Sequence, residues 1–476
     1  MSIAISRKDV LWSYFSQFFS IASGLITLPL ILKLLSTEEI GLNYLMLTVG
    51  SLVILFDFGF TPQFSRNISY VFSGANNIKK EGIDDETVNG KVNYRILATM
   101  ISTAQLVYRR LAFIVLLTML TVGSWYIYEA TEGFTSVNNS FLIWFVYSLS
   151  VFFNIYYSYY NSLLIGKGLI MESRKANVYS KSFYIALTFL LLYLGTGLLG
   201  VAVANLIAPF IGRFLSYRFF FTKELKLKIS EFDIEKKEKL DLFNIIWYNS
   251  KKLGLVFLGS YAINKLSMFL AGLYLSLEQV ASYGLMIQLA STIGTISSTL
   301  FIIYQPRFSA LRIEKKKKLL LHEFSFSMNI YYLLYILGSV LLVFLGPVGL
   351  ELIGSNAELP ERYILSMFLM IIFLEGNHAN FATFIVTKND IPFVKSALIS
   401  GGVIGLCSYL SLELTNFDIL GLIVVQGLTQ LAYANWKWPS EVCKEFNISY
   451  IRFLKLGGLE SFNKIKYLLN ISKKKV

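Results

Sequence analysis

The chain has 476 residues, of which 55% are apolar, 16% aromatic and only 15% charged. Soluble proteins carry about 25% charged residues, so this composition excludes an ordinary soluble enzyme and indicates a polytopic membrane protein. The net charge of +13 argues only weakly for a nucleic-acid partner, because a basic surface that follows phosphates needs an exposed scaffold. Two cysteines and two histidines are too few and too scattered to predict a disulfide framework or a metal site.

Twelve apolar segments are long enough to cross the hydrocarbon core as helices, which takes about 20 residues. They lie at 10–32, 40–60, 111–128, 141–165, 178–194, 198–217, 253–275, 279–304, 326–346, 363–386, 394–412 and 418–436. The fifth is the least regular, because Lys181 lies in its first turn. The sequence therefore predicts an all-α membrane protein with twelve transmembrane helices.

Basic residues gather in alternate connections. With the N-terminus inside, the exceptions are Lys33 and Arg362 in outward connections and Lys265 near the middle of the seventh span. This pattern follows the positive-inside rule and predicts that both termini are cytoplasmic. The segment 92–110 is amphipathic, and we expect it to lie along the inner membrane surface. For the tail after Phe446, a surface helix and a solvated basic linker both remain open.

Two pairs of similar motifs indicate an internal repeat. They are Leu35-Ser36-Thr37-Glu38-Glu39-Ile40 with Leu275-Ser276-Leu277-Glu278-Gln279-Val280, and Pro62-Gln63-Phe64-Ser65 with Pro306-Arg307-Phe308-Ser309. Both pairs keep the same orientation, which predicts two parallel-repeat six-helix lobes around a central cavity. The predicted domains are an N-terminal lobe (1–222), a cytoplasmic linker (223–252), a C-terminal lobe (253–436) and a basic amphipathic cytoplasmic tail (437–476).

Polar residues recur on single faces of several predicted spans. Amide and hydroxyl groups beside aromatic rings suit a sugar, although Ser, Thr and Gly on such faces equally suit close helix packing. The predicted substrate-binding residues of the cavity are Lys265, Asn264, Gln17, Asn154, Tyr157, Asn161, Gln288, Gln426 and Gln430.

Lys265 is the most informative of these residues, because a cation at the centre of a span costs roughly 2.5–3.5 kcal/mol. Three roles remain open for it: contact with an anionic ligand, an ion pair with Glu375, or extension to an interface. Glu375 and His378 share one helix face and, with Asp57, are candidates for ion coupling. For Asp57, an ion pair with Arg66 that caps the second span is the favoured role.

The motifs Leu28-Pro29-Leu30, Leu35-Ser36-x-x-Glu39-Ile40-Gly41 and Asp57-Phe58-Gly59-Phe60, together with Asn264-Lys265 and Glu278-x-Val280-Ala281-x-Tyr283-Gly284, resemble Wzx-type polysaccharide repeat-unit flippases. That family is part of the multidrug/oligosaccharidyl-lipid/polysaccharide exporter superfamily. The resemblance implies a non-enzymatic protein without cofactors in a bacterial inner membrane, which moves undecaprenyl-diphosphate-linked oligosaccharides for O-antigen or other surface polysaccharides. It also implies membrane lipids, a polysaccharide polymerase and a chain-length regulator as partners.

Two rival functions remain. A cation-coupled multidrug or small-molecule exporter of the same superfamily is the closest, since Asp57 and Glu375 could bind a cation. A membrane-embedded polymerase or glycosyltransferase is less favoured, because no outward connection is long enough for an acidic catalytic loop. Primary ATP-driven transport is not expected, because Gly90-Lys91 and Gly166-Lys167 lack the rest of a phosphate-binding loop.

Overall fold

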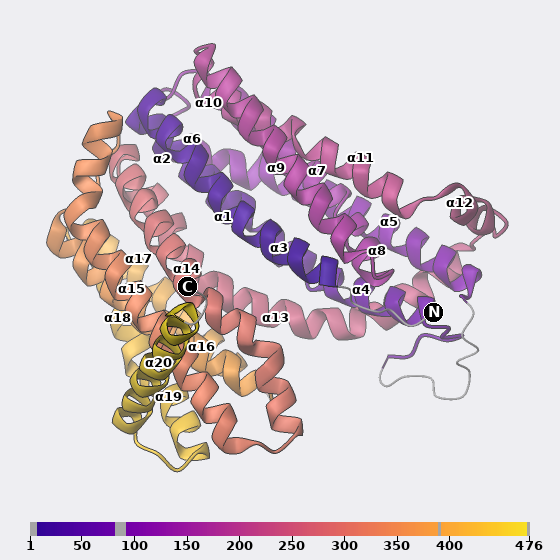
Figure 1. Cartoon of the computed structure of the whole chain (residues 1–476). Coiled ribbons are helices and arrows are strands. Elements are labelled where there is room, and N and C mark those ends of the chain that lie inside the picture. Colours follow the sequence, from indigo (N-terminus) through magenta and orange to yellow (C-terminus); the bar gives the residue numbers. More distant parts are fainter. Residues whose placement is uncertain (1–6, 81–91, 389–391, 474–476) are drawn as a thin grey trace. The chain divides into compact units, whose positions relative to one another are not determined.

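A computed structural model describes residues 7–80, 92–388 and 392–473, and every regular element in these ranges is helical (Figure 1). The helices form two compact units. Unit 1 comprises Met1–Tyr261 with Ser276–Glu278, and unit 2 comprises Ala262–Leu275 with Gln279–Val476.

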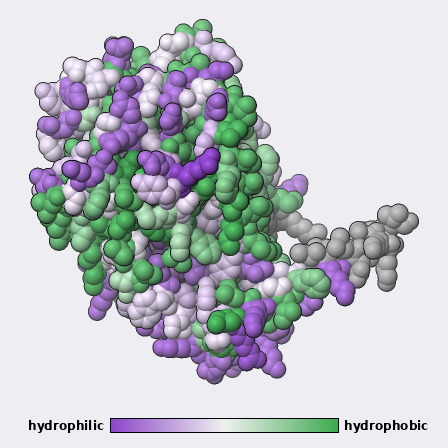
Figure 2. All heavy atoms as spheres, turned by 90° about the vertical axis from the view of Figure 1, so that its left-hand side faces the viewer, coloured by the Kyte–Doolittle hydropathy of each residue, from purple (hydrophilic) through white to green (hydrophobic). Residues whose placement is uncertain are grey.

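Within the described residues, ten helical segments are long and apolar enough to cross a membrane, which confirms an all-α membrane protein. The predicted fifth and seventh spans, 178–194 and 253–275, also lie on long helices but are not among these ten. The count of twelve therefore stays a prediction. Figure 2 shows many exposed apolar side chains, as expected for surfaces that meet lipid.

Unit 1 contains the first thirteen helices, the last of which continues into unit 2. They are α1 (Arg7–Leu34), α2 (Thr37–Ser51), α3 (Val53–Asp57), α4 (Phe60–Phe72), α5 (Tyr94–Thr118), α6 (Ser124–Ala130), α7 (Ser140–Tyr156), α8 (Tyr159–Gly166), α9 (Ile170–Tyr193), α10 (Gly197–Ile207), α11 (Pro209–Phe220), α12 (Lys223–Ser230) and α13 (Lys236–Tyr274). The predicted linker 223–252 is thus mostly helical, since it holds α12 and the start of α13.

The amphipathic segment 92–110 is not a helix of its own, and its place along the inner membrane surface stays a prediction. Helix α5 begins at Tyr94 and continues through a π-helical turn, Met119–Gly123, into α6. The reason is a buried stripe at helical spacing, including Leu97, Ile101 and Tyr108, that packs inside unit 1. At the π turn the fully buried Trp144 donates a hydrogen bond from Nε1 to Ser124 Oγ at 3.0 Å.

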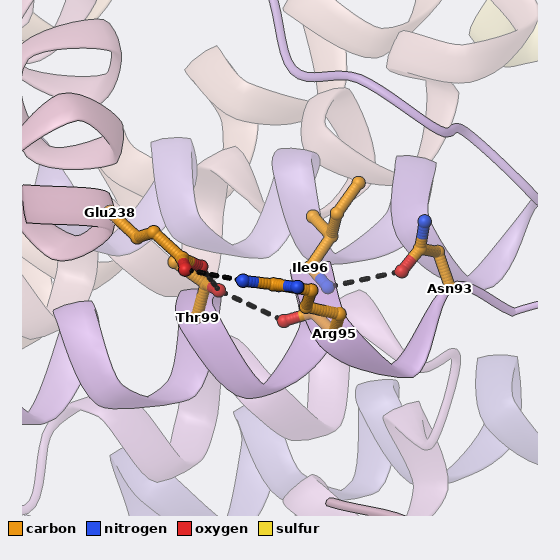
Figure 3. A network of polar contacts seen from close by, with 5 residues as sticks. All are labelled: Asn93, Arg95, Ile96, Thr99 and Glu238. Carbon is orange, nitrogen blue, oxygen red and sulfur yellow. Dashed lines mark hydrogen bonds and ion pairs between the residues drawn. The ribbon is translucent and has the colours of Figure 1, made fainter. Parts of the chain in front are cut away.

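The start of α5 is tied to the start of α13 by the polar network of Figure 3. Arg95 pairs with Glu238 at 2.7 Å, and the Thr99 hydroxyl donates to the same carboxylate at 3.4 Å. Asn93 caps α5 by accepting from the backbone N–H of Ile96. The hydrogen bond from Arg95 lowers the pKa of the Glu238 carboxyl below its usual value.

Unit 2 contains six further helices and most of a seventh. They are α14 (Leu277–Ile313), α15 (Lys317–Ile353), α16 (Arg362–Val386), α17 (Val394–Leu414), α18 (Asp418–Ala432), α19 (Ala434–Glu445) and α20 (Tyr450–Lys473). Their core is aromatic: Phe324 stacks on Phe384 with ring centroids 3.9 Å apart, and Phe308 and Trp438 are buried in the same cluster.

The repeated motifs occupy matching positions in the two units. In unit 1, Ser36 and Glu39 form a capping box at the start of α2, and Glu39 Oε1 also accepts from the backbone N–H of Leu198 at the start of α10. In unit 2, Gln279 at the start of α14 donates to Asp418 at the start of α18. The motif in each unit thus contacts the first turn of the last predicted span of that half. This shared contact supports the predicted parallel repeat.

The tail is a docked helix, so the solvated-linker alternative is wrong. Phe453 of α20 is buried against Phe324 and Phe381, with ring centroids 5.2 and 5.3 Å away. Asn329 of α15 donates to the Ser461 hydroxyl at 2.8 Å. Docking also needs close backbone approach, because a Cβ at Gly457 would lie 2.5 Å from the carbonyl oxygen of Ser325.

Neighbouring glycines of α20 provide a matched test of this docking. Gly458 has no atom within 4 Å of an added Cβ. We expect Gly458→Ala to raise the free energy of unfolding by up to about 1 kcal/mol through helix propensity. Gly457→Ala should lower it by about 1–3 kcal/mol, since α20 must move off α15. Thermal unfolding in detergent measures both, and equal shifts of the two variants would contradict the docking geometry.

Candidate functional site

In unit 1, Asn154 and Tyr157 meet an arginine that the sequence analysis did not single out. Arg213 of α11 donates from Nη2 to Asn154 Oδ1 at 2.7 Å. Its guanidinium carbon lies 4.3 Å from the ring centroid of Phe210, 5.3 Å from Tyr157 and 5.9 Å from Phe153. Nη1 is buried without a hydrogen-bond partner in the described structure. The cluster therefore combines a cation, an amide and aromatic faces, which can bind an anionic or sugar group.

Arg213 was missed because it lies near the inner end of the predicted sixth span, 198–217. The positive-inside pattern groups such a residue with the basic inner connection. The detectable signal was its spacing from Phe210 and Tyr217 on the same helix face.

Asn161 and Gln17 do not join this cluster through any described contact. Asn161 Oδ1 accepts from the Ser173 hydroxyl at 2.7 Å, which links α8 to α9. Gln17 is exposed on α1, whereas Ser16 and Ser23 on that helix are buried. Near Gln17, the buried face of α1 is therefore the one that carries Ser16, and the predicted cavity residue Gln17 points away from it.

Asp57 lies at a break in the second predicted span, where Phe58 and Gly59 adopt left-handed backbone conformations, with φ of 44° and 73°. Its carboxylate accepts from the Thr61 hydroxyl and from the Tyr108 hydroxyl, each at 2.9 Å, and from the backbone N–H of Thr61. The predicted ion pair with Arg66 is wrong, because Arg66 donates to Gln63 instead. Asp57 caps the start of α4 and fastens it to α5. Its ion-coupling role stays a prediction.

Lys265 is half-buried on the part of α13 that is in unit 2, and Asn264 beside it is exposed. Within the described part of the chain, Lys265 makes no ion pair. The carboxylate suggested as its partner is engaged elsewhere, since Glu375 Oε1 accepts from Gln426 Nε2 at 2.8 Å. The alternative of a Lys265–Glu375 ion pair is therefore not realised.

The remaining predicted residues of unit 2 lie on three helices. Gln430 of α18 is buried, like Gln426, and Gln288 of α14 is half-buried. His378 Nδ1 lies 2.6 Å from Asn435 Oδ1 and so contacts α19. Glu375 therefore contacts Gln426 of α18, whereas His378 contacts Asn435 of α19. Whether Glu375 and His378 couple an ion stays a prediction.

No protein-family model matches the chain, and the comparison with curated proteins finds no similar sequence. Solved structures do match. An inward-facing multidrug resistance MATE family transporter of the MOP superfamily superimposes with a TM-score of 0.65 at 14% identity, over 91% of this chain and 95% of that one. The lipid II flippase MurJ, in an inward closed conformation, gives 0.61 at 13% identity, over 99% and 93%. A MATE protein in complex with MaD3S gives 0.52 at 13% identity, over 92% and 96%. The chain therefore has the all-α membrane fold that these MATE and MurJ transporters share.

Proposed function

We propose that the protein is a flippase that moves undecaprenyl-diphosphate-linked oligosaccharide repeat units across a bacterial inner membrane. Two six-helix lobes would alternate between inward-open and outward-open states, with both termini in the cytoplasm. The fold shared with transporters supports the general class, and the order of the Wzx-like motifs supports the substrate. The repeat units would serve O-antigen or another surface polysaccharide, and a polymerase and a chain-length regulator would act next.

The observation that carries this proposal is that Lys265 makes no ion pair with any residue that the structure describes. In the predicted span 253–275 it is about 18 Å from the start and about 15 Å from the end at 1.5 Å per residue, which is far for the side chain to reach an interface. Glu375 is occupied by Gln426. Of the three roles open for Lys265, contact with an anionic ligand is thus the best supported. A diphosphate is negatively charged, so it can pair with the Lys265 ammonium group. The bound ligand would then offset the free-energy cost of placing that cation within a membrane span.

Unit 1 by itself contains a group of side chains that suits a sugar. Tyr157 and Phe210 offer ring faces beside the guanidinium of Arg213. Apolar C–H faces of sugars pack on such rings, while sugar hydroxyls can exchange hydrogen bonds with the exposed amide of Asn154. We therefore keep Asn154 and Tyr157 as substrate contacts and add Arg213.

Deletion of the gene tests the function directly. Lipid-linked repeat units should accumulate on the inner leaflet, where a membrane-impermeant glycan-labelling reagent reaches them in inverted vesicles but not in spheroplasts. The wild-type chain should restore labelling on the outer face. Normal outer-face labelling in the deletion strain would overturn the proposal.

A cation-coupled exporter is the second candidate, favoured by one observation. Glu375 is a carboxylate within a predicted span whose described hydrogen bond comes from a neutral amide, that of Gln426. Such a carboxylate can take up a proton or a sodium ion. If it does, Glu375→Gln should remove the dependence of transport on an imposed proton or sodium gradient. The same gradient dependence in this variant and the wild type would exclude ion coupling at Glu375.

A further inference from the structure

A basic pocket opens on the exposed side of α5 in unit 1. It has a volume of about 860 Å³ and lies between α5, the end of α7 and the start of α8. Its polar wall consists of Gln105, Arg109, Arg110, Tyr156 and Tyr159. These residues give it two guanidinium groups, one amide and two phenol hydroxyls. None of the predicted substrate contacts lines it.

Among the described residues, no acidic side chain pairs with the two arginines of the pocket. Arg109 and Arg110 are exposed, and no ion pair or hydrogen bond of either side chain is described. Other arginines differ in this respect: Arg95 pairs with Glu238, and Arg312 pairs with Glu445. Adjacent positions on one helix would normally diverge, yet both side chains line the same cavity. Two neighbouring positive charges in one pocket favour an anion, and guanidinium groups suit a phosphate geometrically.

An apolar ridge continues from the pocket along α5. Phe113 also lines the pocket, and it is 52% exposed. Leu117 follows one turn later and is 66% exposed. Both lie on the segment Tyr94–Ala130, which is long and apolar enough to cross a membrane. If this segment crosses the membrane, such exposed side chains would meet acyl chains, which would put the arginines about one helical turn from hydrocarbon.

We propose that this pocket binds the phosphate of a membrane lipid, with the lipid chain lying along Phe113 and Leu117. A soluble anion would satisfy the arginines but would leave the ridge unused. A lipid-borne phosphate matches both parts, since it joins a negative headgroup to a hydrocarbon chain within a few ångströms. Tyr156 and Tyr159 supply hydroxyl groups that can donate hydrogen bonds to the phosphate oxygens of such a headgroup. The phosphate belongs either to an anionic phospholipid or to a polyprenyl carrier.

The experiment uses the full chain purified in a neutral detergent, with lipid binding followed by native mass spectrometry and thermal unfolding. The probes are phosphatidylglycerol, phosphatidylcholine, undecaprenyl phosphate and inorganic phosphate. Arg109→Gln with Arg110→Gln forms the test variant. Lys236→Gln with Lys237→Gln is the matched control, because these lysines are also adjacent, basic and exposed.

The wild type and the control should bind phosphatidylglycerol more tightly than phosphatidylcholine, and the Arg109/Arg110 variant should bind it at least about tenfold more weakly. Preferential binding of undecaprenyl phosphate, lost in the same variant, would assign the site to the carrier lipid. Unchanged lipid binding in the Arg109/Arg110 variant would overturn the proposal. So would inorganic phosphate binding as tightly as the lipids.

Discussion

Replacing Lys265 with glutamine is expected to reduce translocation of lipid-linked repeat units at least tenfold while leaving the protein stably folded. A charge-assisted hydrogen bond to the diphosphate contributes about 1.5–3 kcal/mol, which corresponds to roughly one to two orders of magnitude in binding. Lys265→Arg keeps the cation and should retain part of the activity. Glycan labelling at the cell surface of a complemented deletion strain measures the effect.

The stability of the same variant separates a ligand contact from a structural role. A lysine in a structural ion pair leaves a buried carboxylate behind when it is removed, which destabilises the fold. Lys265 has no such pair in the described structure, so Lys265→Gln should unfold at the same temperature as the wild type or higher. The control is Lys395→Gln, an exposed lysine at the start of α17. Full surface labelling by Lys265→Gln would refute the ligand contact.

Replacing Glu445 with glutamine is expected to lower the free energy of unfolding of unit 2 by about 3 kcal/mol. Glu445 ends α19 and holds two cations, Arg312 at 2.5 Å and Lys388 at 2.7 Å. Arg312 also donates to Thr387 Oγ1 at 2.6 Å. The side chains of Arg312 and Glu445 are only 14% and 18% exposed, so removing the carboxylate leaves poorly hydrated positive charge where α14, α16 and α19 end.

Glu441→Gln is the matched control for this prediction. Glu441 pairs with Lys437 one turn away on α19, and the two side chains are 47% and 30% exposed. Such a pair contributes about 0.5 kcal/mol or less and is screened by salt. The Glu445→Gln loss should persist at high salt, whereas any Glu441→Gln loss should vanish. Equal shifts in thermal unfolding would contradict a buried cluster at Glu445.

The helical class and most spans could be predicted from hydropathy, because apolar length is a local property of the chain. The start of α5 could not. Arg109 and Arg110 interrupt the apolar run, so the hydropathy of residues 94–110 resembles that of a surface segment. What makes this segment part of a longer helix is the burial of Leu97, Ile101 and Tyr108 against other helices, which is a tertiary property.

For the site residues too, features within one helix could be predicted from the sequence, whereas contacts between helices could not. Single-face periodicity placed Asn154 and Tyr157 on one face of a predicted span. Both contact Arg213, which lies on another helix and near a span end. Glu375 was a reasonable partner for Lys265 by charge alone. Glu375 bonds to Gln426 because of the way α16 packs against α18. The spacing of residues within one helix gives no information about that packing.

Two buried tryptophans, one in each unit, allow the unfolding of each unit to be followed by fluorescence. Trp144 is 0% exposed in unit 1, and Trp438 is 4% exposed in the aromatic core of unit 2. Buried indoles emit at shorter wavelength than hydrated ones. A chain that keeps only one of these two tryptophans would therefore report the melting of one unit by a red shift of its fluorescence. In such chains Glu445→Gln should lower the transition seen by Trp438 and leave that of Trp144 in place.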